Sequence, residues 1–414
     1  MKNLKGAALL GQSGGPTSVI NSSAAGVFLE ALRQENITAV YGAAHGIKGV
    51  LNEEFYDMSL EDLDELKRLK NTPASMIGSV RYKLADPKKD DTDYQRLLEV
   101  FKKYNIRFFF YNGGNDSMDT CNKISKYFKK AGYDCNIIGI PKTIDNDLFV
   151  TDHSPGYGSA AKYVATTFME LYLDATVYDI PQITVVEVMG RNAGWLTAAS
   201  YLATQKGLGP DLIYLPEIPF VLEDFFEDIE NVLKTKNKVL IAVSEGIKNV
   251  DGQYVAETLQ PLKVDAFGHA QLGGIATVLA DEIANRIDTK VRAIEFSLLQ
   301  RSAAHLASKV DVEEAFKAGQ RAVRAAVNGT SGRMVGFERV SSNPYKIKYK
   351  MIPLRQVANA EQKVPLEWIK PRGQGLTQDF VDYALPLIQG DSKAALVDGL
   401  PRFAQLKKIR VPKK

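Results

Sequence analysis

Residues 137–147 read IIGIPKTIDND, a short apolar run that opens directly into a loop of charged side chains. The β-branched run is typical of a strand that is buried on both faces of a parallel sheet. In the loop, Asp145 and Asp147 project in a similar direction, so one carboxylate can act as a general base while the other orients it or binds metal. Lys142 places beside them a cation of the kind that offsets charge on a transferring phosphoryl group. The stretch therefore predicts a strand of an α/β fold with chemistry at its carboxyl end.

The same alternation of apolar runs and helical segments extends outward along the chain. The runs predicted as buried strands are residues 6–10, 107–111, 136–139, 183–188 and 239–243. The clearest helix covers residues 222–233, where apolar residues recur on one face and two carboxylates lie near the positive end of the helix dipole. After about residue 332 the pattern loosens, and residues 346–350 alternate like an exposed strand. This order predicts an α/β fold with mostly parallel sheets flanked by helices and a C-terminal extension.

The composition excludes several classes of protein. The 414 residues suffice for two or three domains, or for one two-lobed unit with an extension. With 52 basic and 49 acidic residues, the net charge of +3 gives no electrostatic case for binding nucleic acid or an anionic membrane. No apolar run approaches the ~20 residues of a membrane span, and the run at the N-terminus is too short for a signal peptide. Cys121 and Cys135 form neither a disulfide framework nor a zinc motif, so we expect a reducing, cytoplasmic location.

A glycine-rich loop follows the first predicted strand, where residues 11–18 read GQSGGPTS. Gly14 and Gly15 allow backbone N–H groups to approach an anion at the N-terminus of the next helix, although a tight turn that requires glycine also explains them. The loop matches the Gly-x-Ser-x-Gly pattern of α/β hydrolases as well, which leaves a serine hydrolase as an alternative. Its triad would consist of Ser13, Asp145 and His269.

A second glycine-rich loop, residues 112–119, reads NGGNDSMD and follows an aromatic strand. Gly114 can hold phosphate through its backbone, and the side-chain oxygens of Asn115 and Asp116 are of the type that binds Mg²⁺. A helix cap formed by Asp116 or Ser117 is the competing structural interpretation.

Further groups suited to a sugar phosphate follow in the second half of the chain. In residues 188–194, VMGRNAG, Arg191 can fork onto a phosphate or a sugar hydroxyl while Gly190 admits a ligand to the backbone. Glu245, at the end of another predicted strand, suits sugar hydroxyls. His269 is a single histidine, a kind of residue that is more often structural than catalytic.

Taken together and in this order, the loops resemble those of the phosphofructokinase family, particularly its pyrophosphate-dependent branch. The matching motifs run from Gly11 to Val335. The resemblance implies a two-lobed fold with a donor-phosphate lobe at residues 1–157, a sugar-phosphate lobe with helices returning to the first lobe at residues 158–330, and a C-terminal extension at residues 331–414. It also implies Mg²⁺-dependent, reversible transfer of a phosphoryl group from pyrophosphate to the 1-hydroxyl of fructose 6-phosphate in glycolysis, by a homodimer or homotetramer.

The family's site residues carry over to the matching positions of this sequence. Asp145 is implied to be the base that takes the proton of the sugar hydroxyl, with Asp147 assisting. The residues implied to bind the donor are Gly14, Gly15, Arg81, Gly114 and Ser117. Those implied to hold fructose 6-phosphate are Thr143, Met189, Gly190, Arg191, Glu245, Lys263 and His269.

Two positions bear on the choice of donor. ATP-using relatives carry glycine where this chain has Asp116 and Lys142. The resemblance implies that the Asp116 carboxylate crowds and repels the α-phosphate of ATP, while Lys142 stabilises the pyrophosphate leaving group. An ATP-dependent 6-phosphofructokinase is the alternative.

Three positions depart from the family's pattern. Asn115 stands in place of an aspartate that is usual as a magnesium ligand. Gln182 and Leu272 each replace an arginine. The site for the acceptor phosphate is therefore poorer in arginine than in many relatives.

Three alternatives come from other functional classes. A serine hydrolase leaves the other glycine-rich strand ends unexplained. A dehydrogenase would rest on residues 156–161, GYGSAA, which do not directly follow a strand. A non-catalytic sugar-phosphate sensor would have no use for Lys142, Asp145 and Asp147 together.

Overall fold

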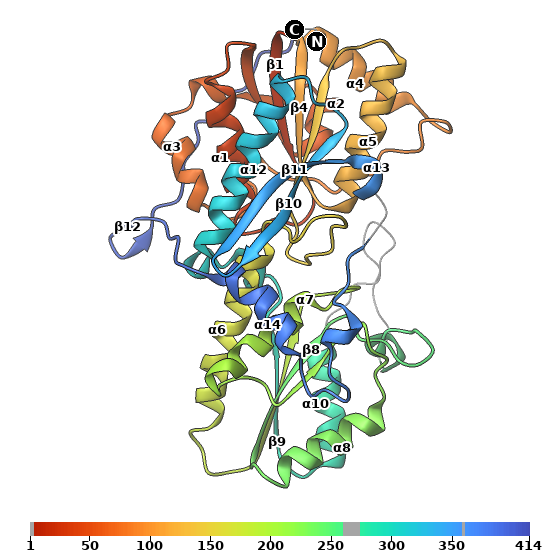
Figure 1. Cartoon of the computed structure of the whole chain (residues 1–414), viewed down its shortest axis with the longest axis vertical. Coiled ribbons are helices and arrows are strands. Elements are labelled where there is room, and N and C mark those ends of the chain that lie inside the picture. Colours follow the sequence, from red (N-terminus) through yellow and green to blue (C-terminus); the bar gives the residue numbers. More distant parts are fainter. Residues whose placement is uncertain (1–3, 260–273, 358–360) are drawn as a thin grey trace.

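The protein has two lobes, each built around its own β-sheet (Figure 1). The computed structural model describes residues 4–259, 274–357 and 361–414. The first lobe contains a seven-stranded sheet with the order β11-β10-β5-β4-β1-β2-β3. The second lobe contains a four-stranded sheet with the order β7-β8-β6-β9.

The strands of the first sheet are β1 (Gly6–Gln12), β2 (Ile37–Ala43), β3 (Phe55–Asp57), β4 (Ile106–Gly113), β5 (Asn136–Pro141), β10 (Arg333–Ser342) and β11 (Tyr345–Pro353). Those of the second are β6 (Gln182–Val188), β7 (Leu212–Tyr214), β8 (Lys238–Ser244) and β9 (Lys290–Glu295), while β12 (Leu396–Val397) and β13 (Leu400–Pro401) form a separate hairpin. The helices of the first lobe are α1 (Ile20–Ala31), α2 (Gly46–Leu51), α3 (Leu63–Arg68), α4 (Thr92–Lys103), α5 (Asn115–Lys130), α12 (Lys309–Val327) and α13 (Leu354–Val357). Those of the second are α6 (Tyr157–Ala175), α7 (Trp195–Ala199), α8 (Leu222–Leu233), α9 (Val255–Leu259), α10 (Ile275–Arg286), α11 (Leu299–Ser302) and α14 (Gln378–Ala384).

The predicted α/β fold with mostly parallel sheets flanked by helices is confirmed. Every run predicted as a buried strand lies within one of these strands, and the predicted helix is α8. β1, β4 and β5 pair in parallel, as do β6, β8 and β9. The antiparallel strands β3 and β11 close the two edges of the first sheet.

The central strand β4 has an aromatic sequence because both of its faces are covered. Phe109 packs into an apolar cluster with Leu9 and Phe101 on one side of the sheet. Phe108 and Phe110 pack into a different cluster. Successive side chains of a strand point to opposite faces, so a strand between two layers of helices requires apolar residues without interruption.

The chain returns to the first lobe through α12, which packs along α1. The two helices touch at glycines: a Cβ on Gly26 would lie 2.0 Å from the carbonyl oxygen of Phe316, and one on Gly319 would lie 2.1 Å from that of Ser23. Side chains at these two positions would push the helices apart, so glycine permits the close approach of the backbones.

The start of α12 is tied to the start of α6. The carboxylate of Asp311 accepts hydrogen bonds from the backbone N–H groups of Gly156 and Ser159, both at 2.9 Å. The N–H of Ser308 also donates to the Ser159 hydroxyl at 3.1 Å. The chain therefore leaves the first lobe and re-enters it at neighbouring points.

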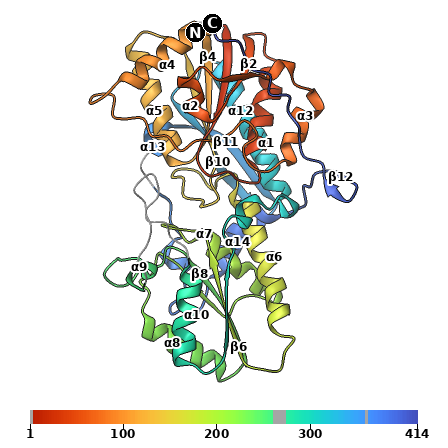
Figure 2. The same cartoon turned by 180° about the vertical axis from the view of Figure 1, so that it is seen from behind.

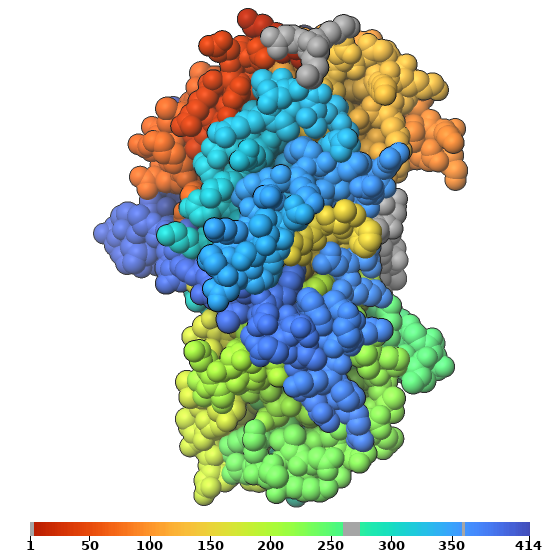
Figure 3. All heavy atoms as spheres, viewed as in Figure 1, coloured from red at the N-terminus to blue at the C-terminus, as the bar shows by residue number. Residues whose placement is uncertain are grey.

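The C-terminal segment, residues 361–414, belongs to both lobes. Phe380 and Leu387 are buried in the core of the second lobe, together with Trp195. Farther along, the carbonyl of Ile409 accepts a hydrogen bond from the N–H of Asp57 in the first lobe at 2.9 Å. Figure 3 shows the first part of this segment, in darker blue, lying across the front of the molecule at the seam and over the second lobe, and Figure 2 shows its end running along the first lobe on the opposite side. The lobe boundaries expected from the sequence stay a prediction.

A buried charged group, the His153 cluster, lies between the β10–β11 hairpin and α12; it comprises Asp152, His153, Glu314, Arg339 and Tyr345. The imidazole nitrogens of His153 lie 2.7 Å from Asp152 Oδ2 and 2.7 Å from Glu314 Oε2. Arg339 donates to Asp152 at 3.0 Å, and Tyr345 donates to Glu314 at 2.8 Å. Burial lowers the pKa of His153, but the two carboxylates outweigh burial and raise that pKa to about 9.

Among the described residues, no helix combines the length and the apolar character that a membrane crossing requires. Cys121 and Cys135 are free thiols. Burial raises the pKa of both thiols, which disfavours the reactive thiolate form.

We predict that His153 makes the free energy of unfolding decrease as the pH rises from about 6.5 to about 9. In this range the folded protein keeps the imidazole proton and the unfolded chain loses it. The stabilisation, on the order of 1–3 kcal/mol, is therefore complete below about pH 6.5 and is lost as the pH passes through about 9.

Denaturant unfolding at a series of pH values measures this effect. His153→Gln should lack the decrease over this range, whereas His305→Gln, at an exposed position, should retain it. An unchanged pH dependence in His153→Gln would contradict the prediction.

Candidate active site

Those of the predicted loops that the structure describes meet at the seam between the two lobes. In Figures 1 and 2 the loop after β5, in yellow, lies at this seam. Besides burial, the charges of Glu245 after β8 and Arg191 after β6 influence the pKa of Asp145 after β5. The carboxyl ends of strands from both sheets therefore contribute to one site.

The β5 loop, residues 142–156, is shaped by hydrogen bonds of its own backbone. The N–H of Lys142 donates to the carbonyl of Gly113 at 3.0 Å, and the N–H of Thr143 donates to that of Pro155 at 3.1 Å. The Thr143 hydroxyl accepts a hydrogen bond from the N–H of Asp145 at 3.1 Å. Thr143, predicted to contact the sugar, thus also fixes the backbone that carries Asp145.

Lys142 buries a cation where the β5 loop meets the glycine-rich loop after β1. Its side chain is 4% exposed, and its ammonium donates to the carbonyl oxygen of Gly15 at 2.5 Å. Burial lowers the pKa of Lys142 to about 8, against the opposing effect of Asp145 and with the help of Arg301. The side chain therefore remains cationic at neutral pH.

Asp145 and Asp147 are half-buried carboxylates with raised pKa values. Burial is the largest cause for both; Glu245 adds to the rise for Asp145, and Asp145 adds to the rise for Asp147. The Nδ2 of Asn115 donates to Asp147 Oδ2 at 3.0 Å and fixes this carboxylate. Perturbed carboxylates beside a buried lysine are typical of sites that move protons.

Two arginines approach the glycine-rich loop after β1. A Cβ on Gly15 would lie 2.7 Å from Arg301 Nη1 and 4.0 Å from Arg81 Nη2. A Cβ on Gly14, which has a φ of +77°, would lie 3.3 Å from Lys142 Nζ. Cationic groups therefore surround a backbone that has no side chains to block it, an arrangement suited to an anion.

The N-terminus of α5 places Asp116 in the first helical turn. Its side chain is 83% exposed, and Lys83 Nζ lies 3.9 Å from Asp116 Oδ1. Ser117 is buried, with its hydroxyl only 2.1 Å from where a Cβ on Gly113 would be. Gly114 occupies the N-cap position, so the interpretation of Asp116 or Ser117 as a helix cap is wrong.

Asn115 directs an unsatisfied oxygen into the same region. Its Oδ1 is buried and has no hydrogen-bond partner among the described residues. Within those residues, no group of three or more His, Cys, Asp and Glu side chains could hold a metal ion. Mg²⁺ does not require such a group, because one or two protein oxygens together with substrate phosphates commonly hold it.

In the second lobe, the loop after β6 is fixed to the end of β8. The N–H of Gly190 donates to Glu245 Oε1 at 3.2 Å, and the Ser244 hydroxyl donates to the carbonyl of Gly190 at 2.6 Å. The N–H of Met189 donates to Gln300 Oε1 at 3.2 Å. The positions outside the described residues are Lys263, His269 and Leu272.

Three residues that the sequence analysis did not assign also reach the site. They are Gln300, Arg301 and Glu361. Glu361 accepts a hydrogen bond from Asn192 Nδ2 at 3.1 Å and adds to the rise that burial causes in the pKa of Asp145. Arg301 lies within the range of the matching motifs, Gly11 to Val335, so the resemblance could have pointed to it, whereas no local pattern marks Glu361.

Ser13, the nucleophile of the hydrolase alternative, is part of the loop's internal structure. Its side chain is buried, and its hydroxyl donates to the carbonyl of Val80 at 3.3 Å. Its backbone N–H donates to the carbonyl of Asn112 at 2.9 Å. These contacts give the serine a structural role between β1 and β4.

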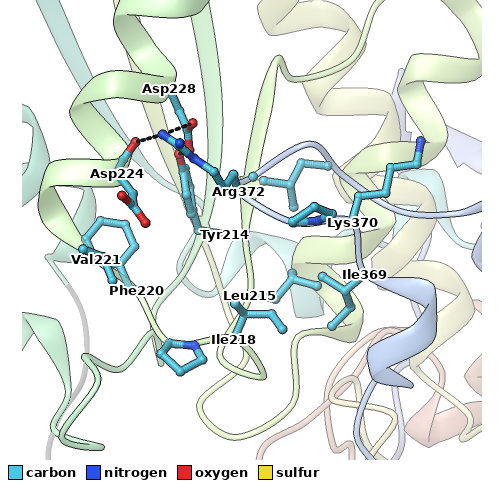
Figure 4. Close-up of a pocket in the computed structure, with 14 residues that line it drawn as sticks. Tyr214, Leu215, Ile218, Phe220, Val221, Asp224, Asp228, Ile369, Lys370 and Arg372 are labelled. Atoms are coloured by element: carbon cyan, nitrogen blue, oxygen red, sulfur yellow. Dashed lines mark hydrogen bonds and ion pairs between the residues drawn. The ribbon is translucent and has the colours of Figure 1, made fainter.

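A hollow of about 390 Å³ lies away from these loops, between β7, the start of α8 and residues 369–373 (Figure 4). Arg372 contacts Asp228 there at 3.0 Å, and the Tyr214 hydroxyl donates to the same carboxylate at 3.1 Å. None of the predicted site residues that the structure describes lines this hollow, so we do not assign the active site to it.

Comparisons with known proteins extend over nearly the whole chain. The profile of the family described as Phosphofructokinase matches residues 8–325. Proteins named pyrophosphate–fructose 6-phosphate 1-phosphotransferase from Halomonas elongata and Methylococcus capsulatus are 43% and 42% identical over 412 residues, which cover 98% of this chain and 97% of each relative. A solved structure of a pyrophosphate-dependent phosphofructokinase from Marinobacter aquaeolei has a TM-score of 0.89 at 40% identity, covering 99% of this chain and 98% of that one. The chain belongs to the phosphofructokinase family.

Proposed function

We propose that this chain transfers a phosphoryl group from pyrophosphate to the 1-hydroxyl of fructose 6-phosphate, giving fructose 1,6-bisphosphate, reversibly and within glycolysis. The observation that carries the proposal is the buried ammonium of Lys142, which donates a hydrogen bond to the carbonyl oxygen of Gly15 and interacts electrostatically with the carboxylate of Asp145. The names of the relatives support the same reaction and the same donor.

In the proposed mechanism, Asp145 takes the proton of the 1-hydroxyl as the sugar oxygen bonds to phosphorus and the bond to the second phosphate breaks. Its raised pKa suits this step, because a base is most effective when its pKa lies near the working pH. Lys142, Arg81 and Arg301 offset the charge that develops on the leaving phosphate. In the reverse direction, Asp145 returns the proton.

Asp116 is proposed to exclude nucleotides. The N-terminus of a helix attracts phosphate through its N–H groups and its dipole. A carboxylate in the first turn of α5 weakens this attraction and repels a further phosphate. Pyrophosphate has no group at this point, whereas ATP would bring its α-phosphate against Asp116.

We propose Mg²⁺ as the cofactor, held by Asn115 and Asp147. Their oxygens are the hard ligands that Mg²⁺ prefers, and the partnerless Oδ1 of Asn115 within the described residues fits such a role. When bound there with phosphate oxygens, the ion would supply neutralising charge to the transferred group.

The acceptor is proposed to lie on the side of the second lobe, where Arg191 and Glu245 supply a cation and a carboxylate. Gln182 lies away from the proposed acceptor position beside Arg191 and Glu245. Its side chain is buried at the start of β6 and donates to Thr184 at 3.2 Å, whereas Met189 follows the other end of the strand.

The proposed partners are small molecules, and we propose a cytoplasmic homodimer or homotetramer. An apolar patch near the end of α6 supports self-association, since each of its members is more than half exposed. The patch consists of Leu173, Val177, Tyr178 and Ile180. The two free thiols are consistent with a reducing compartment.

We predict that Asp145→Asn lowers kcat by about 10²–10⁴-fold, because the amide cannot accept the proton of the hydroxyl. Initial rates with pyrophosphate and fructose 6-phosphate measure the loss, and thermal unfolding shows whether the variant is folded. Asp398→Asn, in the exposed β12–β13 turn, is the matched control and should keep full activity. A kcat within tenfold of the wild-type value in Asp145→Asn would remove Asp145 from the proposed role.

We also predict that Asp116→Gly raises kcat/KM for ATP by about tenfold or more, as expected when a repulsion of about 1.4 kcal/mol is removed. Initial rates with each donor measure the change. Asp116→Asn separates charge from volume, because it removes the negative charge and keeps the size of the side chain. Steric and electrostatic exclusion are both rejected if neither variant gains turnover with ATP.

A further inference from the structure

The residue between the two acids of the β5 loop has an unusual backbone conformation. Asn146 has a φ of +54° and is 1% exposed. The left-handed region costs an ordinary L-residue about 1–2 kcal/mol, and asparagine is among the residues that tolerate it best. This conformation turns the chain between Asp145 and Asp147, so whatever holds Asn146 also fixes the directions of both carboxylates.

The side chain of Asn146 is held at both ends. Its Nδ2 donates to the hydroxyl of Tyr383 at 2.7 Å, and its Oδ1 accepts from the N–H of Ser154 at 2.9 Å. The Tyr383 hydroxyl in turn donates to the carbonyl of Asp152 at 2.8 Å. A single hydroxyl from α14 thus links the two halves of the β5 loop.

Tyr383 is itself held by the His153 cluster. Arg339 Nη1 donates to the carbonyl of Tyr383 at 2.8 Å, and the guanidinium lies 4.8 Å from the centre of the tyrosine ring. The same arginine donates to the carboxylate of Asp152, which lies next to His153. Trp195 packs on the ring with a centroid distance of 5.1 Å. The phenol is therefore rigid in position and can fix a neighbouring loop.

A second contact from the C-terminal segment reaches the same loop. The N–H of Gln362 donates to the carbonyl of Asp147 at 2.8 Å. Both Tyr383 and Gln362 lie beyond residue 325, where the match to the family profile ends. These contacts give the C-terminal segment a role that the family's motifs do not assign.

We propose that Tyr383 is a positioning residue for phosphoryl transfer: acting through Asn146, its hydroxyl holds the β5 loop so that Asp145 and Asp147 face the substrates. The inference rests on the proposed function for the roles of these two aspartates. Tyr383 touches neither substrate in this mechanism, so its loss should leave the KM values for both substrates nearly unchanged. Because the two carboxylates would no longer be held in the reactive direction, its loss should lower kcat.

A double-mutant cycle tests the proposal. Tyr383→Phe removes one oxygen, and Asn146→Gly removes both side-chain hydrogen bonds while glycine keeps the positive φ without strain. We expect each variant to lower kcat by about tenfold or more, with KM within about twofold. Because both residues act in one chain of contacts, the double variant should be no slower than Asn146→Gly alone.

Tyr133→Phe is the matched control. Its buried hydroxyl lies 2.8 Å from each of two backbone carbonyl oxygens, those of Phe101 and Ile106, and shares its one proton between them in the core of the first lobe. It should lose stability without losing kcat. A wild-type kcat in Tyr383→Phe, a loss seen mainly in KM, or losses that multiply in the double variant would each overturn the proposal.

Hydrogen exchange provides a readout that does not depend on activity. Amides of the β5 loop should exchange faster in Tyr383→Phe and not in Tyr133→Phe. Unchanged exchange overturns the positioning of the loop, whatever Asp145 does. If the loop loosens as expected while Asp145→Asn stays active, the proposed function fails and the role of Tyr383 in holding the loop stands.

Discussion

The buried ammonium of Lys142 is the interaction on which the arrangement of the site depends. Removing the lysine ammonium from water costs several kcal/mol of solvation free energy, which interactions with surrounding groups must offset. The carbonyl of Gly15 and the charges of Asp145 and Asp147 supply part of this compensation, which links the loop after β1 to the loop after β5. Arg301 works in the opposite sense, since it lowers the pKa of Lys142 further. The excess positive charge beside a bare glycine backbone favours the arrival of an anion.

The fold class could be predicted because each central strand is an apolar run and α8 keeps one apolar face. The strands β2, β3, β7, β9 and β10 were missed. β9, for example, is an edge strand that is largely exposed or half-exposed, and polar and apolar residues alternate over only the first four positions of its sequence, KVRAIE. For the candidate site, the single stretch of residues 142–147 placed Lys142 and Asp145 in one loop. The contacts of Tyr383 and Glu361 could not be predicted, since the former joins residues 237 positions apart and leaves no local pattern.

The C-terminal segment connects the organisation of the lobes to the geometry of the loop. Its early residues reach the β5 loop, its middle packs into the core of the second lobe, and its end runs along the first. The His153 cluster adds a charged support at the same junction, where the β10–β11 hairpin and α12 meet. A segment with few recognisable motifs can thus be essential to the shape of a site whose chemistry lies on other elements.

The hydrogen bonds that the Asp311 carboxylate accepts from Gly156 and Ser159 have a consequence for the connection between the lobes. Because one carboxylate holds both the exit and the return of the chain, the part of the second lobe between Gly156 and Asp311 has the form of a module inserted into the first lobe, with its two ends side by side, and the C-terminal segment packs onto this module afterwards. Insertions of this kind are tolerated where the ends of the inserted part lie close together. Changes in the inserted module can therefore accumulate over evolution without redirecting the strands of the host domain. Under the proposed function, this would let the acceptor side of the site diverge while the donor side is kept.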